Sequence, residues 1–231
     1  MTWPAGCVFL DLDGPLVDVS ARYFAVHARI LAARGVDPGD SRAWWDRKRR
    51  GLSNAALLAE ARIAVPGDDY ARDWLAAIEG DDVLALDRPV PGAIPALAAI
   101  AAHHPVVLVT LRQRCEALGA QLDRLGITPY LAAVRCASPL EGPGGPTKAR
   151  LIGDGGSVER AVCIVGDTEV DVEAGRRVGL RTVAVASGIR DRAALAALLP
   201  DVLVDDLAAW VAAGRPVSTQ PGFSGFRRDV K

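Results

Sequence analysis

The stretch Cys7-Val8-Phe9-Leu10-Asp11-Leu12-Asp13-Gly14 decides the fold of this chain. Four apolar residues, typical of a strand buried on both faces, are followed at once by two carboxylates spaced two residues apart and by a Gly14-Pro15 turn. A strand that ends in this way points both acids out of the carboxyl edge of its sheet, where open α/β sheets bind their ligands. Two acids this close repel each other, and proteins mostly tolerate that where a divalent cation or acid–base chemistry uses the pair.

Strand-like and helical patterns alternate along most of the chain. Helical spacing is seen, for example, at Leu118, Leu122 and Leu125, with Gly126 after the last turn. The apolar runs typical of strands lie at 7–10, 106–110, 131–136, 161–165, 182–186 and 202–204. Strands that alternate with helices predict an α/β fold, here a Rossmann-like three-layer core with a parallel sheet.

The interval between the first two strands is far longer than one crossover needs. Most of it has helical patterns without a strand. The expected helices are Arg22–Arg34, a segment with Trp44 and Trp45 capped by Ser41, Asn54–Arg62 capped by Ser53, Asp69–Glu79, and then Ala93–Ala102 in the core. We therefore predict a core domain formed by residues 1–17 and 90–213, an inserted α-helical cap domain formed by residues 18–89, and a C-terminal tail at 214–231.

Two further strands end in groups that suit phosphate chemistry. The strand at 106–110 ends in the hydroxyl of Thr110, and the strand at 161–165 is followed by Gly166-Asp167, with Asp171 one helical turn later. Phosphoryl transfer needs a nucleophile, an acid for the leaving oxygen, and groups that neutralise charge on the phosphoryl oxygens. Carboxylate oxygens of Asp11 and Asp167, with a backbone carbonyl and waters, suit octahedral Mg²⁺.

Lys148 stands out against the composition of the chain. The sequence has 24 arginines and three lysines, so a lysine at a basic position is the exception. An ammonium is a compact point charge that fits where the broader guanidinium fork does not. This indicates that position 148 requires a small cation.

These four motifs resemble those of the haloacid dehalogenase-like hydrolase superfamily, in its phosphatase branch with a helical (C1-type) cap, the group similar to phosphoglycolate phosphatases and β-phosphoglucomutases. The resemblance extends over the chain to about residue 213 and rests on 11–18, Thr110, Lys148 and 166–171. It implies that Asp11 is the nucleophile and forms an aspartyl-phosphate. It also implies that Asp13 is the general acid and base and lends its backbone carbonyl to Mg²⁺.

The resemblance assigns the remaining motif residues as well. Thr110 and Lys148 would hold the phosphoryl group, Asp167 would bind the metal, and Asp171 would support the metal site. The sequence departs from the family at Pro15, where a threonine is usual. Proline removes a hydroxyl and an amide donor, so we expect the turn to survive and the rate to change.

Candidate substrate-binding residues lie in two places. Leu111 and Arg112 follow Thr110 at the sheet edge, and the arginine could meet an anionic group there. The basic run at 47–53 is either a solvated helix end or a cap loop that contacts the substrate, in which case Arg50 and Ser53 are the candidates.

The composition of the chain limits which binding partners and which cellular compartment we expect. Half of the residues are hydrophobic and the net charge is −1, which gives no electrostatic footprint for nucleic acid or an acidic membrane. No apolar run approaches the roughly 18–20 residues that span a bilayer, and there is no basic segment ahead of an apolar one at the N-terminus. The four cysteines are far apart in sequence, which favours a reduced, cytoplasmic protein, and we expect a monomer or homodimer.

We therefore predict a Mg²⁺-dependent phosphatase that hydrolyses a small phosphomonoester metabolite. The alternatives are a phosphosugar mutase of the same fold and, because of Pro15, a non-catalytic phosphate-binding module. A dehalogenase is disfavoured because that branch lacks the second acid, Asp13. A phosphonate-cleaving enzyme would need a Schiff-base lysine in the cap, for which Lys48 is the one candidate.

Overall fold

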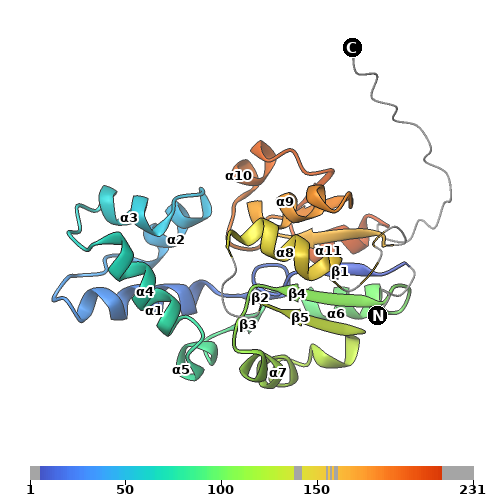
Figure 1. The fold of residues 1–231 in the computed structure, drawn as a ribbon, viewed down its shortest axis with the longest axis horizontal. Coiled ribbons are helices and arrows are strands. Elements are labelled where there is room, and N and C mark those ends of the chain that lie inside the picture. The colour runs from blue at the N-terminus through green and yellow to red at the C-terminus, as the bar shows by residue number, and fades with distance from the viewer. Residues whose placement is uncertain (1–5, 138–141, 155, 157, 159–160, 215–231) are drawn as a thin grey trace, which may run out of the picture.

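The computed structural model describes residues 6–137, 142–154, 156, 158 and 161–214, and its centre is a six-stranded parallel sheet (Figure 1). The strand order is β5-β4-β1-β6-β7-β8. The strands are β1 (Val8–Leu10), β4 (Val106–Thr110), β5 (Ala133–Cys136), β6 (Cys163–Gly166), β7 (Thr182–Val185) and β8 (Val202–Val204). The predicted α/β fold with a parallel sheet is confirmed.

The first strand lies in the middle of this sheet. In the register of the sheet, Leu10 is level with Leu108 of β4 and with Val165 of β6. The backbone amide of Asp11 donates to the carbonyl oxygen of Val165 at 2.9 Å. Because the three strands run in the same direction, their carboxyl ends meet at one edge, which is where Asp11 emerges.

Alternate residues of the strands face two separate hydrophobic clusters, which makes the core three layers thick. Val8 and Leu10 belong to one cluster, and Phe9 belongs to the other. The first cluster contains side chains of α6 (Ala93–Ala101), α7 (Cys115–Arg124) and α11 (Leu207–Ala212). The second contains side chains of α8 (Gly144–Gly153) and α9 (Glu169–Arg177). The remaining core elements are η1 (Thr128–Tyr130) and α10 (Arg192–Ala197).

The long interval after β1 is helical, as predicted, and its first four helices lie together beside the sheet (Figure 1). The helices are α1 (Ser20–Ala32), α2 (Ser41–Arg49), α3 (Asn54–Glu60), α4 (Gly67–Ala77) and α5 (Asp81–Leu84). They have a hydrophobic cluster of their own, around Val26, Leu31, Leu58 and Tyr70. This separate cluster supports the proposal that residues 18–89 form a cap domain and residues 1–17 and 90–213 the core.

Two short strands join the ends of this interval. β2 (Val17–Asp18) pairs antiparallel with β3 (Arg88–Pro89), so that the chain leaves and re-enters the core at one place. The sequence analysis did not predict this pair, because a strand of two residues has no periodicity that a pattern could show.

The predicted helix caps are partly confirmed. The hydroxyl oxygen of Ser53 accepts a hydrogen bond from the amide of Ala56 and caps α3, as expected. The expected cap at Ser41 is wrong, because Asp40 accepts from the amide of Ala43 and Ser41 is already the first residue of α2. A carboxylate is the stronger acceptor at a helix N-terminus.

The predicted tail at 214–231 lies outside the described residues, apart from Gly214. Among the described helices, none has the length and apolarity that crossing a membrane requires.

Candidate active site

The carboxyl edge of the sheet opens into a cavity of about 220 Å³. The predicted residues that line it are Asp11, Asp13, Thr110, Leu111, Arg112 and Lys148. Thr110 is buried at the end of β4, where its hydroxyl oxygen accepts from the amide of Arg112 at 3.3 Å. The cap contributes Arg22, Leu75, Ile78 and Glu79 to the lining.

Lys148 is the cation at the centre of the acidic residues. Its side chain, on α8, is about 2% exposed, and Nζ lies 3.0 Å from Oδ2 of Asp11 and 2.6 Å from Oδ1 of Asp171. Burial would lower the pKa of Lys148, but the two carboxylates outweigh it and raise this pKa above its ordinary value. The ammonium therefore stays charged and faces the cavity.

Asp167 has the features of a metal ligand. Oδ2 accepts from the amide of Ile189, whereas Oδ1 is buried without a hydrogen-bond partner in the described part of the chain. The backbones of Gly14 and Gly188 pack against this carboxylate so closely that a Cβ at either position would lie 2.0 Å from Oδ2. A buried orphan oxygen held in this way fits a bound cation.

Three acids converge at this point. Asp11, Asp167 and Asp171 can each offer one oxygen within 4.8 Å of the others. Burial, together with the neighbouring acids Asp171 and Asp13, raises the pKa of Asp11 to about 7 although Lys148 opposes the shift. Burial and the same kind of repulsion raise the pKa of Asp167 well above its ordinary value. A divalent cation would relieve the repulsion, so these residues fit Mg²⁺.

Asp171 differs from the other two acids because both its oxygens are engaged. Oδ1 accepts from Lys148, and Oδ2 accepts from the hydroxyl and the amide of Thr168 in the turn that begins α9. This arrangement suits the predicted supporting role, in which Asp171 holds Lys148 and the loop of Asp167.

Asp13 is paired with arginine. Its carboxylate accepts two hydrogen bonds from Arg112, Nε to Oδ2 at 2.8 Å and Nη2 to Oδ1 at 2.7 Å, and Nη2 of Arg22 lies 3.0 Å from Oδ2. Burial would raise the pKa of Asp13, but the two guanidinium groups hold it below its usual range. Arg112 is thus paired with a protein carboxylate in the lining of the cavity, and both its predicted contact with the substrate and the metal role predicted for Asp13, through its backbone carbonyl, stay predictions.

The turn with Pro15 is closed by backbone hydrogen bonds. The amide of Gly14 donates to the carbonyl oxygen of Val17 at 2.8 Å, and that of Leu16 donates to Leu12 at 3.2 Å. The hydroxyl of Ser187 donates to the carbonyl oxygen of Gly14 at 3.0 Å, which ties the turn to the loop after β7. The expectation that the turn survives the proline is confirmed.

The structure does not place Arg50 and Ser53 at the cavity. Arg50 is exposed and donates to the carbonyl oxygen of Asp46 in its own helix, and Ser53 caps α3. The residue of this run that reaches the core is Arg49, whose Nε donates to the carbonyl oxygen of Gly188 at 3.0 Å. The basic run therefore docks the cap on the loop that holds Asp167.

Comparisons with known proteins agree with this geometry. Residues 143–210 match a family model described as HAD-hydrolase-like. Curated phosphoglycolate phosphatases are similar over most of the chain: that of Agrobacterium fabrum is 29% identical over 213 residues, covering 86% of this chain and 88% of its own. That of Synechococcus elongatus is 28% identical over 198 residues, covering 86% and 92%. The chain is thus similar to phosphatases of the haloacid dehalogenase-like hydrolase superfamily.

Solved structures show the same fold. A haloacid dehalogenase-like family protein from Streptococcus pneumoniae superposes with a TM-score of 0.73 at 21% identity, covering 91% of this chain and 99% of that one. A structure described as a putative β-phosphoglucomutase from Thermotoga maritima gives 0.63 at 20% identity, covering 92% and 100%.

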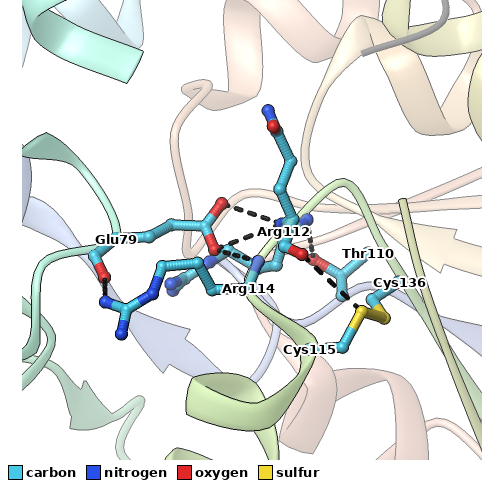
Figure 2. The surroundings of a disulfide bond; sticks show 7 residues. Glu79, Thr110, Arg112, Arg114, Cys115 and Cys136 are labelled. Carbon is cyan, nitrogen blue, oxygen red and sulfur yellow. Dashed lines mark hydrogen bonds between the residues drawn. A yellow bond between two sulfur atoms is a disulfide. The ribbon is translucent and has the colours of Figure 1, made fainter. Parts of the chain in front are cut away.

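This hydrolase has a disulfide beside its active site, between Cys115 at the start of α7 and Cys136 at the end of β5 (Figure 2). The expectation of reduced cysteines is wrong for this pair, because the parallel pairing of β4 and β5 brings together residues that are distant in sequence. Cys7 and Cys163 are free and buried, as expected for small apolar residues in the sheet.

The disulfide holds the loop that carries Leu111 and Arg112. Figure 2 shows Glu79 of the cap beside this loop, where its carboxylate accepts from the amides of Gln113 and Arg114 at 2.9 Å each. Nη1 of Arg114 donates back to the carbonyl oxygen of Glu79. The covalent bond and the cap thus fix the same short loop from two sides.

We expect Cys115→Ser to lower the free energy of unfolding by about 3 kcal/mol, because it frees a loop of 21 residues in the unfolded chain. For a chain of this size, that is a fall in melting temperature of roughly 6–12 °C, measurable by calorimetry. Treatment of the wild type with a phosphine reductant should give the same fall and should leave the variant unchanged. A wild type whose melting temperature does not respond to the reductant would contradict the prediction.

Proposed function

We propose that this chain is a Mg²⁺-dependent phosphatase that hydrolyses a small phosphomonoester, with 2-phosphoglycolate as the first candidate substrate. The observation that carries the proposal is that Asp11 and Lys148, from distant segments, line one cavity and form an ion pair there, while Asp167 can offer an oxygen within 4.8 Å of one from Asp11. The candidate substrate comes from the names of the curated relatives.

The residues take complementary roles in this reaction. Oδ1 of Asp11 is held by the amide of Leu12 at 2.8 Å, and its carboxylate attacks phosphorus as the bond to the leaving oxygen breaks. Asp13 gives that oxygen a proton, then takes one from the water that releases phosphate from Asp11. Lys148 and Thr110 bind the phosphoryl oxygens.

Asp11 and Asp167 would hold Mg²⁺, with Asp171 in support. When bound, the cation supplies the positive charge that offsets both the repulsion among the acids and the charge of the phosphoryl group. Oδ1 of Asp167, which is buried without a hydrogen-bond partner among the described residues, would gain a partner from this cation.

Without substrate, the arginine partners hold Asp13 ionised. A phosphoryl dianion in the cavity raises the pKa of a neighbouring carboxyl group by repulsion. Substrate binding therefore prepares Asp13 to act as an acid.

The size of the cavity favours hydrolysis of a small ester over isomerisation of a phosphosugar. At about 220 Å³ it is smaller than the roughly 300–1,000 Å³ typical of sites for drug-sized ligands. A phosphoryl group on a two- or three-carbon acid suits this volume better than a hexose carrying phosphate.

We expect inorganic phosphate to be released from 2-phosphoglycolate in the presence of Mg²⁺, and a chelator to reduce the rate at least about a hundredfold. Mg²⁺ at a hundred times its dissociation constant should also stabilise the fold by about 2.7 kcal/mol, visible as a rise in melting temperature. Activity that persists in the chelator would contradict the metal role. An isomeric phosphate without free phosphate would indicate a mutase, and binding without turnover would indicate a non-catalytic module.

A further inference from the structure

One end of the cavity is lined by two arginines. Lys148, Thr110 and Asp11 account for the phosphoryl group, whereas Arg22 and Arg112 lie around Asp13, the predicted proton donor to the leaving oxygen. The leaving group of the substrate therefore lies at this end. Apart from their contacts with Asp13, the two arginines have no assigned part in the transfer of the phosphoryl group.

Arg22 is a buried residue of the cap, and one of its N–H donors, at Nη2, has no acceptor among the described residues. Its Nε donates to Oδ1 of Asp87 at 3.0 Å and its Nη1 to the carbonyl oxygen of Ile78 at 3.1 Å. Its Nη2 lies 3.0 Å from Oδ2 of Asp13, but the geometry is that of an ion pair without a hydrogen bond. Within the described residues, this buried nitrogen has no hydrogen-bond partner, which is costly unless a ligand supplies one.

Arg112 offers a second donor in the same lining. Nε and Nη2 are used on Asp13, and Nη2 also lies 3.3 Å from Oδ2 of Asp87. Its Nη1 forms no hydrogen bond with the residues that the structure describes. Two guanidinium groups thus retain free N–H donors at one end of the cavity.

Asp87 holds both arginines in place. Its carboxylate is completely buried and accepts from Nε of Arg22, from Nη2 of Arg112 and, at 2.7 Å, from Nε2 of Gln121. This is a preorganised anion-binding arrangement, because no side chain has to be ordered when the ligand arrives.

The charges at this end leave room for one more anion. The two arginines carry two positive charges, which Asp87 and the ionised Asp13 balance, so that one positive charge is left without a partner when Asp13 takes up a proton to act as the acid. Guanidinium groups bind planar carboxylates through paired hydrogen bonds. A carboxylate on the leaving group would complete both the charge balance and the hydrogen bonding.

We infer that Arg22 is a specificity-determining residue which, together with Arg112, binds the carboxylate of the leaving group and so selects short phosphorylated acids over uncharged phosphomonoesters. This inference rests on the proposed phosphatase function and adds a residue of the cap helix α1 to it.

The test compares 2-phosphoglycolate with 2-hydroxyethyl phosphate, which has the same chain length and no carboxylate. For Arg22→Gln we expect kcat/KM for 2-phosphoglycolate to fall at least about 30-fold, mainly through KM, because a buried charged hydrogen bond is lost. For 2-hydroxyethyl phosphate we expect a much smaller change. Arg29→Gln, on the same helix but exposed and paired with Asp82, is the matched control and should leave both substrates unaffected.

Equal losses on the two substrates would overturn the inference, because a purely structural role of Arg22 lowers both alike. A wild type without preference for the carboxylate would overturn it too. Calorimetric binding of both compounds is measured in parallel. If neither is hydrolysed, the phosphatase proposal fails while the binding preference still decides the role of Arg22. If Arg22→Gln does not fold, Arg22→Lys is used, because it keeps the positive charge beside Asp87 but lacks the paired donors of a guanidinium group. The preference for 2-phosphoglycolate over 2-hydroxyethyl phosphate should still fall in this variant.

Discussion

The variant Asp11→Asn should lose at least about 10⁴-fold in the rate of phosphate release, measured with 2-phosphoglycolate and saturating Mg²⁺. The amide cannot form the aspartyl-phosphate, and the remaining groups cannot replace a nucleophile. Asp205→Asn, an exposed acid paired with Arg192, is the control and should keep full activity. A variant at position 11 that retained most of its activity would remove the covalent mechanism.

The same variant, Asp11→Asn, should lose its activity without losing stability. Burial and the neighbouring acids raise the pKa of Asp11 to about 7, so the ionised carboxylate destabilises the metal-free fold above the ordinary pKa of the unfolded chain. A neutral amide of the same shape relieves that cost, and we expect the metal-free melting temperature at pH 8 to be equal to or above that of the wild type. The stabilisation by Mg²⁺ should shrink, since one of its ligands has lost its charge.

The residues of the motifs could be predicted because each follows a local pattern. Asp11, Thr110 and Asp167 come directly after apolar runs, and parallel strands place such positions at one edge of the sheet. Lys148 was found by a different signal, the scarcity of lysine in the chain. The fold and the members of the acidic site were therefore within reach of the sequence.

The arginine network could not be predicted in the same way. Arg22 lies on a cap helix and Asp87 just before β3, 65 positions apart, and nothing near either residue indicates the other. Arg112 could be named because it follows Thr110 at the sheet edge, but among 24 arginines no spacing distinguishes Arg22 as a second one that reaches the cavity. The prediction for the run at 47–53 was wrong for a related reason. The run is basic, as the sequence shows, but the orientation of α2 places the side chain of Arg49 against the core and leaves that of Arg50 within the cap.

The variant Lys148→Met should lose both stability and activity, unlike Asp11→Asn. Lys148 is buried between Asp11 and Asp171, and its removal leaves two carboxylates that repel each other without a cation. Breaking a buried ion pair by removing one partner costs about 3–5 kcal/mol, which corresponds to a fall in melting temperature of roughly 6–20 °C in a chain of this size. Turnover should fall at least about a hundredfold, because a cation that offsets phosphoryl charge is lost.

The response of this variant to Mg²⁺ separates the two effects. Because the metal also supplies positive charge to Asp11 and Asp167, Mg²⁺ should restore part of the lost stability and little of the lost activity. Lys148→Arg should keep more stability than Lys148→Met, because the positive charge remains. Its turnover should stay low, because the planar guanidinium group is too broad for the space that the ammonium of Lys148 occupies between Asp11 and Asp171. A metal-free Lys148→Met protein that melts within a degree of the wild type would mean that this ammonium does not hold Asp11 and Asp171 together. The proposed role of Lys148 in supporting the nucleophile would then be wrong.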